Sequence, residues 1–239
     1  MSQRKEEIIK RLKSGKIIID GHTHVGISTR AYLDYAYPYA MSFEDLIIRM
    51  KLLCIDKAVV FPHVDSLYYN LKTAEPEKVE PCSDLCSFPY EVENTNLFNE
   101  VYEIFPEYSD MALPFAIFDP SRKVREQVAF LEDLYARYPM FGLKTCTTYI
   151  RSFVNDLEGT GTPVLEFARK YHLPITFHSS YYIEDPWARL EDILRIAQAY
   201  PDINVCLAHS ARACLVSGPG GNRPNGRPPR DWHTSGAET

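Results

Sequence analysis

Two histidines separated by one residue follow an apolar run in KIIIDGHTHVG, residues 16–26. In an extended strand the side chains alternate with a period of two, so His22 and His24 would point to the same side. Two imidazoles on one face can hold a divalent metal ion. The alternative is a turn with two solvated histidines, so the metal interpretation needs support from the rest of the chain.

Further polar side chains stand where other apolar runs end. His178 ends the run in LPITFHSS, His209 follows INVCLA, Lys144 lies near the end of MFGLKTCTT, and His63 follows VVFP. In parallel sheets and barrels the C-terminal ends of the strands form the functional face. We therefore expect these groups to gather near the first two histidines. For His178 alone, the alternative is a core histidine with a hydrogen-bond partner.

The elements that would position these residues alternate along the chain. Six short apolar runs predict strands buried on both faces. Between them, helix-start signals or helical spacing appear near residues 42, 121, 162 and 185. Such alternation predicts an α/β fold with a parallel sheet. The six predicted strands are 16–20, 57–62, 112–118, 140–145, 173–178 and 203–208.

Two segments depart from this alternation. The acidic segment 63–94 is expected to be a functional or disordered loop over the C-terminal face of the sheet. The Gly/Pro/Arg-rich segment 217–239 has no apolar periodicity and is predicted to be a disordered tail. Residues 1–216 would then hold about six βα units, whereas a complete eight-unit barrel takes roughly 250 residues. We interpret the change near Leu215 as a frameshift, a splice variant or a misassembled gene model.

Composition excludes several classes of protein. The net charge of −6 does not indicate a nucleic-acid-binding protein. No apolar run approaches the roughly 20 residues that span a bilayer. Residues 1–15 predict an amphipathic helix rather than a signal peptide. The six scattered cysteines favour reduced thiols in a cytoplasmic protein. Cys82 and Cys86 lack a second pair, so a zinc ribbon is not expected.

The motifs IIDGHTHVG, ITFHSS and VCLAHSAR, in this order, resemble the amidohydrolase superfamily. The group that they resemble contains amidohydrolase-related metal-dependent hydrolases and aminocarboxymuconate semialdehyde decarboxylase-like enzymes. The resemblance extends over residues 16–215. It implies a (β/α)8 TIM-barrel-like fold, here without its last two units, that binds a divalent metal at its C-terminal end. Zinc is the expected ion, with manganese or iron as alternatives, and His22, His24 and His178 would be its ligands.

The resemblance also implies catalytic roles. His209 would be a second ligand in a two-metal site or the base that positions the reactive water. Lys144 matches a position that is carboxylated and bridges two metals in binuclear members, and that only lines the site in mononuclear ones. Arg212 and His63 are expected to contact the substrate. The family's strand-eight aspartate has no counterpart here, so we expect catalysis to be impaired.

Three functions follow from these expectations. The first is hydrolysis of a C–N or C–O bond of a small molecule by metal-activated water. The second is non-oxidative decarboxylation of an aromatic or unsaturated carboxylic acid, for which the tyrosine-rich segment 28–40 could stack on a planar ring. The third is a non-catalytic truncated paralogue that forms homo-oligomers or pairs with another chain through open sheet edges.

Overall fold

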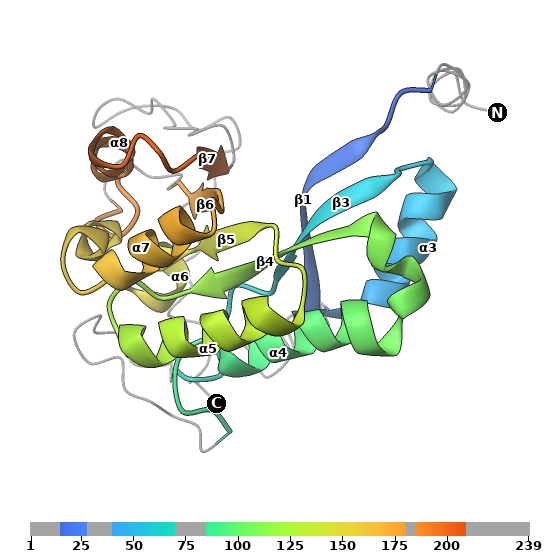
Figure 1. Cartoon of the computed structure of the whole chain (residues 1–239), viewed down its shortest axis with the longest axis horizontal. Coiled ribbons are helices and arrows are strands. Elements are labelled where there is room, and N and C mark those ends of the chain that lie inside the picture. Colours follow the sequence, from blue (N-terminus) through green and yellow to red (C-terminus); the bar gives the residue numbers. More distant parts are fainter. Residues whose placement is uncertain (1–14, 28–39, 70–84, 180–184, 209–239) are drawn as a thin grey trace, which may run out of the picture.

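The computed structural model describes residues 15–27, 40–69, 85–179 and 185–208. Its centre is a sheet of seven strands in the order β2-β1-β3-β4-β5-β6-β7. All neighbouring pairs from β1 to β7 are parallel, and only the short β2 pairs antiparallel with β1. The six parallel strands curl into half of a barrel, with helices along the outside (Figure 1). The predicted α/β fold is therefore confirmed.

The strands agree closely with the apolar runs. β3 (Lys57–Pro62) and β4 (Ala112–Phe118) have the predicted bounds. The next three strands begin two residues later than predicted and end where expected: β5 (Gly142–Thr145), β6 (Ile175–His178) and β7 (Val205–Ala208).

The first strand differs most from its prediction. β1 spans Ile19–Ile27, rather than residues 16–20, and β2 is Ala40–Met41. The strand runs through both histidines, and its ladder with β3 pairs His24 with Phe61 after a register shift between Asp20 and Thr23. The strand therefore carries the histidines and does not end before them.

The four predicted helices are present. They are α3 (Phe43–Leu53), α5 (Val124–Arg137), α7 (Thr162–Lys170) and α8 (Leu190–Ala199). Ser42 caps α3 through the backbone amide of Asp45, whose carboxylate accepts from the amide of Ser42 in return. α8 starts later than the predicted 185, because the Asp185 carboxylate accepts a hydrogen bond from the amide of Trp187 and forms a turn.

Several short elements were not predicted from the sequence. α4 (Glu91–Asn99) continues into a π-helical turn, Glu100–Ile104, and a 3-10 helix, Pro106–Met111. α4 begins without a side-chain cap, and only two of its three buried residues are apolar, so the sequence carries no strong helix signal there. The segment 63–94 therefore ends in a helix and is not entirely a loop. Two further short elements are α6 (Thr147–Ile150) and a 3-10 helix, Val154–Glu158.

Side chains on the outer face of the sheet form the main core with the helices. Val60, Ala116, Leu143 and Ile175 are fully buried members of it, one from each of four adjacent strands. The alternate residues of the same strands point to the inside of the curl, where polar groups stand among aromatic rings. No helix in the described ranges is long and apolar enough to cross a membrane.

Candidate metal centre

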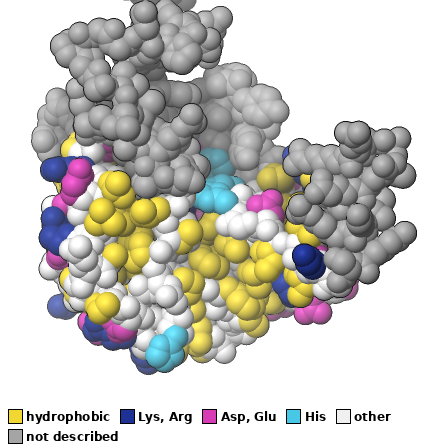
Figure 2. Space-filling view, turned by 90° about the horizontal axis from the view of Figure 1, so that it is seen from above, with side chains coloured by type: hydrophobic (Ala, Val, Ile, Leu, Met, Phe, Trp, Pro, Cys, Tyr) yellow, Lys and Arg dark blue, Asp and Glu magenta, His cyan; other side chains and the backbone are white. Residues whose placement is uncertain are grey.

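His22 and His24 point to the same side of β1, as the alternation predicts. Their Nε2 atoms lie 3.1 Å apart. Two nitrogen ligands of a tetrahedral zinc ion, each about 2.05 Å from the metal, stand about 3.3 Å apart. The pair therefore has the spacing of two ligands of one ion. Figure 2 shows histidine side chains gathered near the centre of one face.

The carbonyl of Pro62 orients the second imidazole of the pair. His24 Nδ1 lies 2.9 Å from this oxygen. A carbonyl can only accept a hydrogen bond, so Nδ1 carries the proton and the lone pair of the neutral ring is on Nε2. This is the arrangement in which a backbone acceptor fixes the tautomer of a metal-binding histidine.

The third predicted ligand lies at the end of β6. The ring of His178 packs edge-on against Tyr149, with the ring centroids 5.9 Å apart. Within the described ranges, no three His, Cys, Asp or Glu side chains form a group that could hold a metal ion. The structure thus brings two of the three predicted ligands together, and His178 as their common ligand stays a prediction. His209 and Arg212 lie outside the described residues, as does the predicted tail.

His63 lies beside the pair, directly after β3. Its ring centroid is 6.3 Å from that of His24. The Asp65 amide donates to His63 Nδ1 over 3.3 Å, and the Asp65 carboxylate stands 3.6 Å from the same nitrogen. Burial lowers the pKa of His63, and the charge of Asp65 opposes this shift. The substrate contact of His63 stays a prediction.

Phe61 joins the histidines to Lys144. The ring centroid of Phe61 lies 4.8 Å from that of His22 and 5.4 Å from that of His24. Lys144 Nζ stands 5.0 Å from the centre of the same ring. Lys144 is only 1% exposed, and its Nζ has no hydrogen-bond partner within the described ranges. Burial lowers its pKa, because desolvation disfavours the ammonium form.

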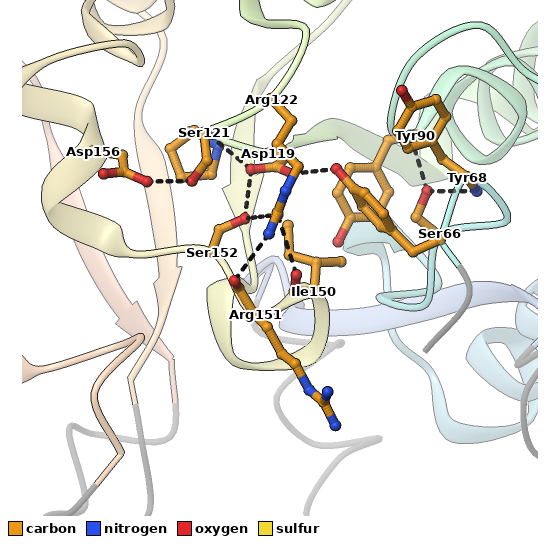
Figure 3. Close-up of polar contacts among 12 residues, drawn as sticks. Ser66, Tyr68, Tyr90, Asp119, Ser121, Arg122, Ile150, Arg151, Ser152 and Asp156 are labelled. Atoms are coloured by element: carbon orange, nitrogen blue, oxygen red, sulfur yellow. Dashed lines mark hydrogen bonds and ion pairs between the residues drawn. The ribbon is translucent and has the colours of Figure 1, made fainter. Parts of the chain in front are cut away.

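A buried polar cluster that was not predicted from the sequence is centred on Asp119, the residue after β4. Asp119 accepts hydrogen bonds from Ser152 Oγ at 2.6 Å and from Arg122 at 3.1 Å (Figure 3). It also accepts a hydrogen bond from the hydroxyl of Tyr69. Tyr69 lies in the loop after β3, Arg122 lies between β4 and α5, and Ser152 follows α6. The cluster ties three loops together at the C-terminal end of the sheet. Asp119 follows a strand just as His63 follows β3, so the same positional rule could have found it.

Three of the cysteines in the described ranges, Cys54, Cys146 and Cys206, are free thiols. Burial raises the pKa of Cys146 to about 12, so its thiol stays protonated at neutral pH.

Comparisons with known proteins give structural matches alone. No protein-family model matches the chain, and no curated protein matches its sequence. The chain resembles 5-carboxyvanillate decarboxylase from Novosphingobium aromaticivorans with bound manganese, at 14% identity and a TM-score of 0.55, over 84% of this chain and 68% of that one. It also resembles IDCase from Metarhizium anisopliae in its apo form, at 13% identity and a TM-score of 0.56, over 84% of this chain and 67% of that one.

A third similar structure is an uncharacterised TIM-barrel protein from Bordetella bronchiseptica, with 15% identity, a TM-score of 0.49, and coverage of 80% of this chain and 66% of that one. The six parallel strands of this chain, with helices outside them, have the arrangement of part of a (β/α) barrel. Identities this low establish the fold and do not carry over an activity. In this barrel, the paired histidines and Lys144 lie on the strands that would line its interior, towards the C-terminal ends where barrel enzymes place their chemistry.

Proposed function

We propose that the chain belongs to the amidohydrolase superfamily and is a metal-dependent hydrolase acting on a C–N or C–O bond of a small molecule. The observation that carries this proposal is the 3.1 Å separation of the His22 and His24 Nε2 atoms on the first barrel strand. The hydrogen bond from His24 Nδ1 to Pro62 supports it, because it directs the Nε2 lone pair towards that shared position.

The proposed roles follow the positions of the side chains. His22, His24 and His178 would hold the ion, and zinc is the expected metal. Manganese is a specific alternative, since it is bound in the similar decarboxylase structure. When bound, such an ion lowers the pKa of a water molecule to about 7 and polarises a substrate carbonyl. His209 would position this water or hold a second ion.

Two residues would act on the substrate rather than on the metal. His63, 6.3 Å from His24 between ring centroids, can reach a molecule that contacts the pair. With Asp65 N–H donating to its Nδ1, the neutral ring carries its proton on Nε2. Arg212 is proposed as a second contact, suited to a carboxylate.

Decarboxylation is the second candidate reaction. One similar structure is a 5-carboxyvanillate decarboxylase, so this barrel can host that chemistry as well. The same histidines would then hold the metal that binds the acid. Measuring carbon dioxide release and hydrolysis on one panel of small esters, amides and aromatic acids separates the two reactions.

Metal content tests the proposal directly. The full chain, purified without chelator, should retain about one divalent ion, measured by elemental analysis. His22→Ala combined with His24→Ala should lower the affinity for zinc by at least about tenfold, because two of the proposed ligands are lost. His172→Asn is the matched control, since His172 is an exposed histidine with a positive φ that asparagine tolerates. Equal zinc affinity of the double variant and the control would reject the site.

A further inference from the structure

Lys144 is a buried cationic side chain without a counter-ion among the described residues. It is 1% exposed, and no carboxylate lies within ion-pair distance of it in the described ranges. Its Nζ is also without a hydrogen-bond acceptor there. By contrast, the ammonium groups of three other lysines each contact an oxygen atom: Lys57 contacts the Asp110 carbonyl, Lys123 contacts Glu126, and Lys170 contacts Glu132.

The surroundings of Lys144 offer little compensation for its charge. Its strand partners are Ile117 on β4 and Thr176 on β6, and its Nζ faces the ring of Phe61. An aromatic face attracts a cation by about 1–2 kcal/mol, whereas burying an unpaired ammonium costs several kcal/mol. The buried ammonium of Lys144 therefore lowers the stability of the folded chain, and an apolar side chain of similar size would give a more stable fold.

The position of Lys144 connects it to the proposed metal centre. Phe61 contacts the rings of His22 and His24 and also the Lys144 ammonium. A ligand of an ion held by these histidines would therefore lie close to a cation that lacks an anionic partner among the described residues. A carboxylate supplies the missing charge and two acceptor oxygens.

We propose that Lys144 binds the carboxylate of the substrate, so that the substrates of this barrel are small organic acids. This inference rests on the proposed function for the reaction itself, but the binding step needs only Lys144. It adds a specific residue to the recognition of the substrate, and it places the acid group on the β5 side of the histidine pair. Both candidate reactions are compatible with an acid as the substrate.

Binding of benzoate and of uncharged benzamide tests the proposal. The full chain is treated with EDTA, so that a metal cannot hold the carboxylate, and each affinity is measured by calorimetry. Benzoate should bind at least about tenfold more tightly than benzamide. Lys144→Met should weaken benzoate binding roughly 10- to 100-fold and leave benzamide within twofold. Lys170→Met removes an exposed lysine at the end of α7 and should change neither affinity.

Thermal unfolding separates lost binding from lost folding. Lys144→Met removes an unpaired buried amine, so its melting temperature should equal or exceed that of the native chain. Should Lys144→Met fail to fold, Lys144→Gln keeps a polar group without the charge and must show the same loss of benzoate affinity. Equal binding of benzoate and benzamide by the native chain, or undiminished benzoate binding by a folded Lys144 variant, would overturn the proposal. Since metal is absent from the assay, these outcomes do not depend on the metal centre.

Discussion

The Nδ1 atom of His24 lies 2.9 Å from the carbonyl oxygen of Pro62, across the ladder that joins β1 to β3. The neighbouring strand therefore determines which nitrogen of His24 faces His22. This backbone acceptor cannot be removed by a side-chain change, and it fixes the ring before any ligand binds. A preorganised imidazole of this kind loses little conformational freedom when it takes a metal.

A divalent ion should stabilise the native chain through this pair. At a zinc concentration 100 times the dissociation constant, binding adds about 2.7 kcal/mol to the free energy of unfolding. For a chain of this size, this raises the melting temperature by roughly 5–10 °C. The shift should disappear in His24→Ala and persist in His172→Asn, as followed by circular dichroism. A similar zinc-induced shift in both variants would place the bound ion elsewhere.

Tyr69→Phe should destabilise the chain through Asp119. The Tyr69 hydroxyl donates to the fully buried Asp119 carboxylate, and its loss leaves that carboxylate with one donor fewer. We expect the free energy of unfolding in urea to fall by about 1.5–3 kcal/mol. Tyr102→Phe is the control, because the Tyr102 hydroxyl donates to the exposed carbonyl of Pro139 and should cost less than about 1 kcal/mol. Equal losses in the two variants would show that the Asp119 cluster adds no special stability.

Local patterns in the sequence predicted those parts of the fold that depend on neighbouring residues. The runs that form β3 and β4 are apolar and end at a proline or before an aspartate, so their bounds were correct. The facing of His22 and His24 follows from the period of a strand, and the structure confirms it. The alternation of strands and helices was sufficient to predict the parallel sheet.

Contacts between distant residues were not predictable in this way. Tyr69 and Asp119 are 50 positions apart, and nothing near either residue indicates the other. α4 was missed for a related reason, since its fully buried Asn94 is satisfied by the backbone of Ile117 on β4 and not by its own helix. Such a polar residue looks like a loop residue until its partner is known. The burial of Lys144 without a partner likewise appears only once the strands are assembled.

Gly142→Ala should destabilise the interior of the barrel. A Cβ atom at position 142 would lie 2.3 Å from Cε2 of Phe115, whose ring packs edge-on against Phe61. Overpacking of this kind costs about 1–3 kcal/mol. Gly21→Ala on β1 is the control, because its Cβ would have no atom of the described residues within 4 Å. Combining Gly142→Ala with Phe115→Leu should recover part of the loss in a double-mutant cycle, and no recovery would exclude Phe115 as the cause.

Glu93 should make the stability of the chain depend on pH. Burial raises the pKa of Glu93 from 4.5 to about 7, and the charge of Asp65 adds to this shift. Its Oε1 accepts a hydrogen bond from the Leu67 amide, while its Oε2 is buried without a partner within the described ranges. Protonation is therefore favoured in the folded chain at a pH where the unfolded chain is already ionised.

The sign of the effect follows from this difference in proton binding. Between about pH 4.5 and pH 7 the folded chain binds one proton more at Glu93 than the unfolded chain does. The contribution of Glu93 to the free energy of unfolding is therefore complete below pH 4.5. It falls by about 1.4 kcal/mol per pH unit as the pH rises towards 7. Glu93→Gln mimics the protonated side chain and should remove this component. Urea denaturation of the native chain and of Glu93→Gln across this range measures the difference, with Glu107→Gln as an exposed control. Parallel pH profiles for the native chain and Glu93→Gln would show that Glu93 ionises equally in the folded and unfolded states.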